Sequence, residues 1–221
     1  MIKEIITDLN QLSERADEID VRKENNEMRE IILDLKQTLR EHKNGVGLAA
    51  PQIGYNKRIF VVNFNGDIRS FINPVITQAK GLTINREGCL SLPGKEYLRP
   101  RNTEITVIYQ TPLGKTESRK IFGMAAFVFQ HELDHLDGIT LADIGLQLDD
   151  NFDKASDEEK NELIKAYMDS LDIKQKDAEK EIEENPQLKQ QADAIKFMEA
   201  LQKGEVELGD QITETKHVDK K

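Results

Sequence analysis

The stretch that most constrains the fold is residues 122–136, which read FGMAAFVFQHELDHL. Nearly every position from 122 to 129 is apolar, so a helix formed here has no polar face to turn toward water. A helix of this kind is buried in a core, and the rest of the domain must pack around it. Two histidines and a glutamate follow within the same helix, so we expect a rigid element that supports a chemical site.

His131 and His135 are four residues apart, a spacing that places both side chains on one helix face, where they can bind one divalent metal ion. Glu132 would then stand beside any water on that metal. Such a water ionises near neutral pH and a carboxylate can take its proton, so the pattern predicts hydrolysis. The alternative is a surface helix that carries two histidines by chance.

Cys89 is the single cysteine of the chain and can supply a third metal ligand. Open catalytic sites typically combine three protein ligands with one position for water. The surrounding residues 87–94, EGCLSLPG, contain glycines and a proline that fix an irregular backbone able to carry a thiolate close to a metal. A buried apolar cysteine and a cysteine nucleophile with a histidine base are the alternatives. The nucleophile interpretation leaves the second histidine and the glutamate unexplained.

Three segments of the chain together resemble the three signature motifs of the peptide deformylases. In chain order they are residues 45–54 (GVGLAAPQIG), 87–91 (EGCLS) and 130–138 (QHELDHLDG). The first segment alone could suggest a nucleotide-binding loop, but no strand precedes it and no Lys-Ser/Thr pair follows. The resemblance covers roughly residues 1–140.

The resemblance implies an enzyme that removes the formyl group from the N-formylmethionine of newly made polypeptides and releases formate. It implies that Cys89, His131 and His135 hold one Fe2+ ion, for which Zn2+ or Ni2+ can substitute, and mixed sulfur and imidazole ligation suits all three metals. Glu132 would be the general base. The carbonyl oxygen would be stabilised by the Gln52 side chain and the Leu90 backbone N–H.

The resemblance also implies a substrate cleft. An apolar slot for the methionine side chain would be lined by Val46, Met124, Phe127 and Val128. Backbone groups of Val46, Gly47 and Gly88 would hold the peptide as an added strand, a mode that gives affinity with little sequence preference. Many bacterial members carry Arg where this chain has Glu96, so contacts to the later substrate residues are expected to differ.

The net negative charge of the chain lies entirely in its carboxy-terminal part. From residue 141 onward there are 22 Asp and Glu against 12 Lys and no Arg, whereas the first 140 residues hold 19 acidic and 19 basic residues. We therefore expect a catalytic domain at 1–150 and an acidic, mainly helical extension at 151–221. The acidity argues against binding nucleic acid or an anionic membrane. It allows a partner with a basic surface, and a solvated helical face that aids solubility is the alternative. Association with the ribosome is a separate expectation. The single cysteine and the lack of a signal-like amino terminus indicate the cytoplasm.

Periodicity predicts an α+β fold with antiparallel sheets around the buried helix. Apolar spacing predicts a helix over 20–42, and the strand-like runs at 58–64 and 68–72 flank Asn65-Gly66, a hairpin signal. A second hairpin is expected over 105–121. In the extension, Ser156 and Glu159 form a capping box for a helix to about Leu171, and Asn185-Pro186 starts another that could end at Gly204.

Two other functions remain compatible with the residues. A metallopeptidase with the His-Glu-x-x-His pattern would take its third ligand from a later acidic residue or His217, and Cys89 would be dispensable. A regulatory or ribosome-associated binding module that has lost catalysis is the second. Intact metal and catalytic positions weigh against it, because a purely structural zinc site favours four protein ligands.

Overall fold

The computed structural model describes residues 1–184, with side chains to residue 172. Residues Met1–Lys160 form one compact unit, and residues from Asn161 belong to a second. The helix expected at 185–204 lies outside the described residues. None of the described helices is long and apolar enough to cross a membrane.

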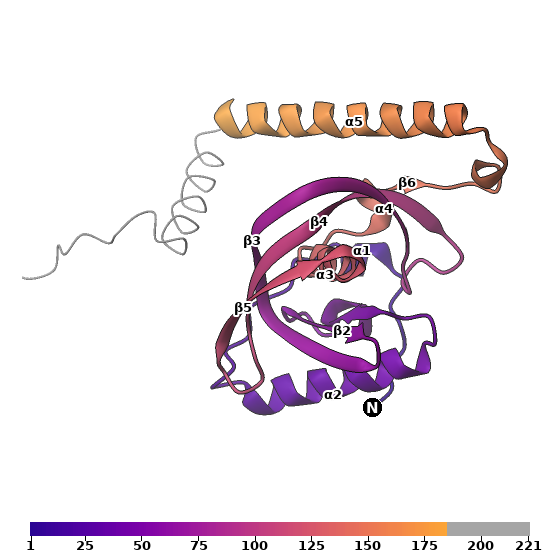
Figure 1. Ribbon diagram of the computed structural model, residues 1–221. Coiled ribbons are helices and arrows are strands. Elements are labelled where there is room, and N and C mark those ends of the chain that lie inside the picture. The colour runs from indigo at the N-terminus through magenta and orange to yellow at the C-terminus, as the bar shows by residue number, and fades with distance from the viewer. Residues whose placement is uncertain (185–221) are drawn as a thin grey trace, which may run out of the picture. The chain divides into compact units, whose positions relative to one another are not determined.

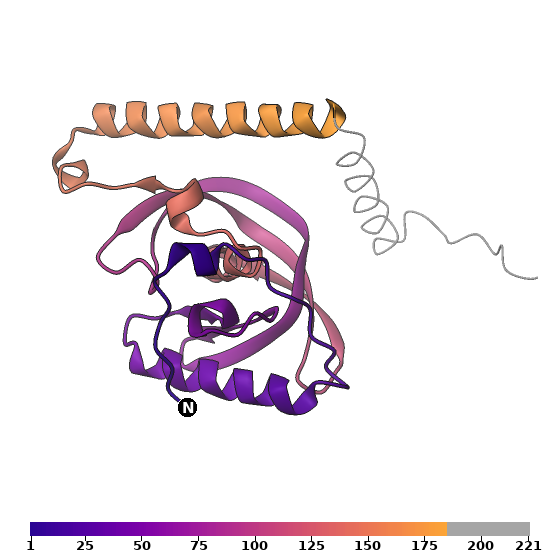
Figure 2. The ribbon, with the colours of Figure 1, turned by 180° about the vertical axis from the view of Figure 1, so that it is seen from behind.

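The first unit is built on a six-stranded antiparallel sheet, so the expected α+β class with antiparallel pairing is confirmed. Its strands are β1 (Gly47–Ala49), β2 (Ile59–Phe64), β3 (Asp67–Gly88), β4 (Glu96–Gln110), β5 (Thr116–Phe122) and β6 (Leu146–Gln147). They lie in the order β1-β2-β3-β4-β5, and β6 pairs with β4. Figures 1 and 2 show the long strands β3 and β4 curving past helix α3 (Gly123–Leu136), which is seen end-on.

Both expected hairpins are present. β2 and β3 pair up to Phe64 and Asp67, and the two residues between them, Asn65 and Gly66, have φ angles of 52° and 96°. Positive φ at both central positions is the geometry that an Asn-Gly turn favours, because its twist matches that of the strands. The second hairpin joins β4 to β5 and closes at Gln110 and Thr116.

Helix α2 (Asn25–Glu41) lies within the range expected from its apolar spacing and packs on β1 and β2. The apolar residues at helical spacing are all buried, namely Met28, Ile31, Ile32, Leu35 and Leu39. They form one core cluster with residues of β2 and with the short 3-10 helix Ala50–Ile53. This packing fixes the segment that leads into β1, and β1 forms one side of the site described below.

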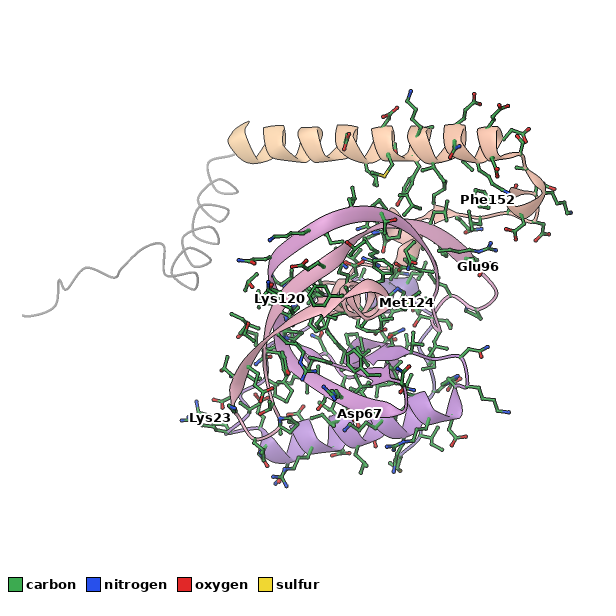
Figure 3. All side chains as sticks on the ribbon, viewed as in Figure 1. Lys23, Asp67, Glu96, Lys120, Met124 and Phe152 are labelled. Carbon is green, nitrogen blue, oxygen red and sulfur yellow. The ribbon has the colours of Figure 1, made fainter. Side chains whose placement is uncertain are left out.

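Helix α3 packs against β1, β2 and β4. Its Phe129 is fully buried and meets Phe60 and Phe71 edge to face, with ring centroids 4.8 and 5.1 Å away. The expectation that the apolar stretch is buried along its whole length is wrong at its start, because Phe122 and Met124 are 58% and 64% exposed. Phe122 is the last residue of β5 and caps the helix, and Met124, labelled in Figure 3, lies in its first turn.

Strand β3 continues far beyond the run at 68–72. Asn73 has a φ of 47°, and its side chain replaces strand pairing by bonding the Ile19 backbone and the Gln110 amide. The register shifts there, and the strand then continues to Gly88. Helix α1 (Leu9–Leu12), helix α4 (Leu141–Ile144) and the 3-10 turn η2 (Phe152–Lys154) complete the first unit.

Helix α5 (Asp157–Glu184) starts at the expected capping box, in which the Ser156 backbone N–H and hydroxyl donate to Glu159. It extends beyond the end expected near Leu171.

Candidate active site

Strand β3 and helix α3 bring the three expected metal ligands together. Cys89 immediately follows β3, while His131 and His135 are one turn apart on α3. Their ligand atoms lie within 4.8 Å of one another, and Cys89 Sγ is 3.2 Å from His135 Nε2. One thiolate and two imidazoles that converge in this way fit a single divalent metal with an open position.

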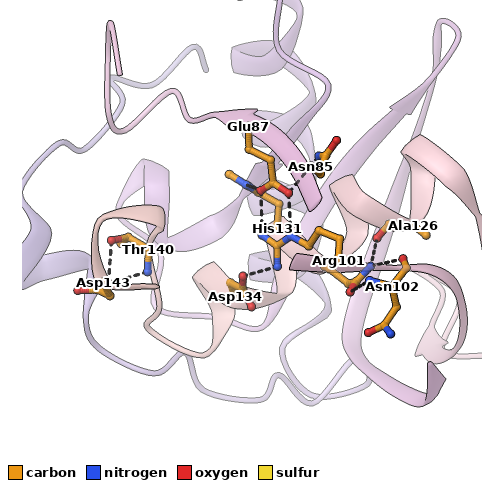
Figure 4. Close-up of polar contacts among 10 residues, drawn as sticks. Asn85, Glu87, Arg101, Asn102, Ala126, His131, Asp134, Thr140 and Asp143 are labelled. Carbon is orange, nitrogen blue, oxygen red and sulfur yellow. Dashed lines mark hydrogen bonds and ion pairs between the residues drawn. The ribbon is translucent and has the colours of Figure 1, made fainter. Parts of the chain in front are cut away.

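A buried ion pair orients His131 (Figure 4). Glu87 Oε2 accepts a hydrogen bond from His131 Nδ1 at 3.0 Å, and a carboxylate can only accept, so the proton is on Nδ1 and Nε2 is left for a metal. Arg101 donates to both Glu87 oxygens at 2.8 and 2.9 Å and to Asp134 at 2.6 Å. Burial by itself raises the pKa of Glu87. The hydrogen bonds from Arg101 and His131 outweigh this effect and lower the pKa to about 2. Glu87 therefore stays ionised.

Sequence reasoning did not assign roles to Glu87 and Arg101. Both are more than nine-tenths buried, which is rare for charged residues unless they are paired. Glu87 belongs to the second motif, so its place beside Cys89 was visible. Its partner Arg101 lies 14 residues further along the chain and becomes its neighbour through the pairing of β3 with β4.

Glu132 is 3% exposed, and its Oε2 atom has no hydrogen-bond partner within the described part of the chain. Burial raises the pKa of its carboxyl to about 7, against the opposing effect of His131. His135 Nδ1 is a second buried polar atom without a partner among these residues. A buried carboxylate oxygen left open beside three convergent ligands is what a metal with a reactive water requires, so the residues fit a bound metal.

Gln52 is buried, and the oxygen and nitrogen of its side-chain amide have different partners. Its Oε1 accepts from the Ala49 backbone N–H at 2.9 Å, which directs the amide Nε2 toward Ser91 Oγ at 3.2 Å and Cys89 Sγ at 3.5 Å. The side chain therefore presents N–H donors to the metal-ligand cluster. Leu90 lies in the turn after Cys89 and lines the same cleft.

The cluster opens into a cleft of about 820 Å³. All six residues expected to contact substrate line it, namely Val46, Gly47, Gly88, Met124, Phe127 and Val128. Val46 and Met124 are 52% and 64% exposed, so the apolar lining is open to a ligand from outside.

Residues 2–149 match the family described as polypeptide deformylase. The chain belongs to this family. A curated peptide deformylase from Dictyoglomus turgidum is 41% identical over 123 residues, which are 56% of this chain and 80% of the relative. The deformylase structure from Thermotoga maritima aligns with a TM-score of 0.61 and 34% identity over 65% of this chain and 97% of its own. A Met-Ala-Ser-bound class I type b deformylase from Acinetobacter baumannii aligns at 0.60 and 27% identity, over 64% and 98%.

Membership establishes the reaction. The deformylase hydrolyses the linear amide between a formyl group and an amino-terminal methionine, so the expected activity is confirmed and the metallopeptidase alternative is not favoured. The matched residues include all three motifs.

Proposed function

We propose that Cys89, His131 and His135 hold one Fe2+ ion, which Zn2+ or Ni2+ can replace, and that Glu132 is the general base of deformylation. The observation that carries this proposal is the convergence of the three ligand atoms beside the unpartnered Glu132 Oε2. A soft thiolate with two imidazoles suits each of these metals. When bound, the ion supplies Lewis acidity, which polarises the formyl carbonyl and makes water easier to ionise.

The remaining chemistry belongs to the protein. Glu132 Oε2 takes a proton from the attacking water and later passes it to the methionine nitrogen as formate leaves. As the formyl carbon becomes tetrahedral, its oxygen gains negative charge. The Gln52 amide and the Leu90 backbone N–H donate to that oxygen, and Ala49 keeps the Gln52 amide in its orientation.

The methionine side chain enters the apolar slot lined by Val46, Met124, Phe127 and Val128. Backbone groups at Val46, Gly47 and Gly88 pair with the peptide, so recognition depends little on the residues that follow. The Met-Ala-Ser-bound relative from Acinetobacter baumannii supports a short peptide as the ligand of this cleft.

We further propose that this protein works in the cytoplasm on formylmethionyl nascent chains, in association with the ribosome. A reducing compartment keeps the Cys89 thiol available as a ligand. We divide the chain functionally into a catalytic domain at 1–150, in which the α3 helix is the central buried element, and an acidic helical extension at 151–221. The first ten residues of this extension still belong to the first compact unit.

The direct test is formate release from formyl-Met-Ala-Ser by protein purified without oxygen and loaded with Fe2+. We expect rapid release, and we expect Cys89→Ala to lose both metal and activity. A metallopeptidase would instead cleave unformylated Met-Ala-Ser and would tolerate Cys89→Ala. Robust activity of the metal-free variant would contradict the proposed ligand set.

A further inference from the structure

The outer end of the cleft is charged, unlike the apolar slot. Arg86, Lys95 and Glu96 line it together with Asn85. Arg86 precedes Gly88 by two residues on β3, a distance of about 7 Å along an extended strand. A peptide that pairs beside Gly88 therefore brings its third or a later residue to this end.

Arg86 is held there by two carboxylates from different parts of the chain. Its Nη1 and Nη2 donate to the two oxygens of Asp153 at 2.7 and 3.1 Å, a bidentate ion pair. Its Nε donates to Glu96 Oε2 at 3.1 Å, and Nη2 contacts the same oxygen. Glu96 and the turn that contains Asp153, marked by Phe152, lie at the same end of the molecule in Figure 3.

The turn with Asp153 is itself tied to this wall of the cleft. β6 pairs with the start of β4 at Tyr97 and Leu98, and the Leu148 N–H donates to the Glu96 carbonyl at 2.8 Å. Asp153 follows in η2, where its carbonyl accepts from Lys160 Nζ at 3.3 Å. The chain beyond the three sequence motifs thus contacts Arg86, a residue that lines the substrate cleft.

These contacts use most of the hydrogen-bonding capacity of Arg86. Four hydrogen bonds use four of its five guanidinium N–H groups, and the carboxylates of Glu96 and Asp153 both face its positive charge. An arginine with free donors would be a natural partner for an acidic side chain, because its planar fork matches a carboxylate. Glu96 and Asp153 remove that possibility.

We propose that Glu96 and Asp153 are specificity-determining residues of the deformylase: by occupying Arg86, they prevent the cleft from selecting substrates with an acidic third or later residue. This inference rests on the deformylase function. Position 96 is acidic in this chain, and the positive charge at this end of the cleft comes from Arg86 on β3. Glu96 on β4 and Asp153 in η2 compensate that charge. With Lys95, which lines the same end, two positive charges balance the two carboxylates. An enzyme that processes many nascent chains gains from this absence of net charge.

The test compares formyl-Met-Ala-Ser-Glu with formyl-Met-Ala-Ser-Lys on the metal-loaded full-length protein. The readout is the ratio of kcat/KM for the Glu peptide to that for the Lys peptide, in which losses common to both peptides cancel. We expect Asp153→Asn and Glu96→Gln each to raise this ratio about twofold to fivefold, the range for exposed ion pairs. Arg86→Gln should lower it, because the two carboxylates then lose one of their balancing charges.

Asp150→Asn is the matched control, since Asp150 is exposed, lies in the same segment and makes no ion pair with Arg86. It should leave the ratio unchanged, and added salt should reduce the shifts of the other variants. Equal ratios in all variants, or shifts of the same sign for Arg86→Gln and Asp153→Asn, would overturn the inference. Turnover of formyl-Met-Ala-Ser by wild type tests the deformylase function separately.

Discussion

Gly47 and Glu132 lie so close together that position 47 has no room for a side chain. A Cβ atom built on Gly47 would stand 2.8 Å from both Cγ and Cδ of Glu132 and would overlap Oε1. Nonbonded carbon atoms prefer about 3.5 to 4.0 Å. Since Glu132 is buried, its side chain cannot simply swing away. The backbone of β1 therefore forms a wall that fixes the carboxylate.

We expect Gly47→Ala to lower kcat by about 100-fold, the cost typical of an approximately 1 Å misplacement of a catalytic group. Metal content should not change, because no ligand is touched. The change should add little in a Glu132→Gln background, where the displaced carboxylate is already gone. Steady-state kinetics on the four proteins of this cycle provide the measurement, and additive losses would contradict the relationship.

Gln52→Ala should reduce kcat by about 100-fold to 1,000-fold, the usual loss when one oxyanion donor is removed. Gln52→Glu keeps an oxygen for the Ala49 N–H and removes the amide donors, so we expect a similar loss from it. Kinetics of the two variants separate donation from packing. If Gln52→Glu retained wild-type kcat, the donor role would be wrong.

Glu87→Ala should lower metal affinity by about 10-fold to 100-fold, because groups that orient a metal-binding histidine typically contribute that much. It should also destabilise the fold by about 3 to 5 kcal/mol, since Arg101 would be left buried without its main partner. Glu87→Gln keeps an oxygen acceptor for His131 and should be milder in metal affinity.

The control for this ion pair is Arg69→Gln. Arg69 pairs with Asp67 at 2.7 Å, but both side chains are exposed, so its loss should cost less than about 1 kcal/mol. Metal titration and thermal unfolding on the three variants give the comparison. Equal destabilisation by Glu87→Ala and Arg69→Gln would contradict the role of burial.

A chain that ends at residue 160 should keep the kcat of the full protein on formyl-Met-Ala-Ser. It retains the whole first unit, including Asp153 and its contact with Arg86, whereas an end near residue 150 would remove that contact. Melting temperature measured on the same samples separates stability from chemistry. A tenfold or larger fall in kcat with unchanged melting temperature would show that residues from 161 onward take part in the reaction.

Local patterns in the sequence predict much of this fold. The spacing of Met28, Ile31 and Leu35 predicts α2, and Asn65-Gly66 predicts the first hairpin, because each signal lies within a few neighbouring residues. The extent of β3 could not be predicted in this way. Its later half is largely exposed and lacks a clear alternation of apolar and polar residues, and its path depends on Asn73 bonds to distant segments.

The same distinction applies to the site. Cys89, His131 and His135 belong to short motifs whose chemistry requires them to meet, and the structure brings them together. Arg101 and Asp153 carry no such signal. Arg101 meets Glu87 through the pairing of β3 with β4, and Asp153 is brought near Arg86 by the pairing of β6 with β4. Both pairings depend on the fold and not on neighbouring residues in the sequence.

The most direct test of the proposed chemistry is Glu132→Gln, which changes the carboxylate to an amide of nearly the same size. Metal content and formate release from formyl-Met-Ala-Ser should be measured on the same sample. We expect wild-type metal content with turnover lower by at least about 100-fold, the usual contribution of a general base. Activity within about threefold of wild type at full metal content would contradict the role assigned to Glu132.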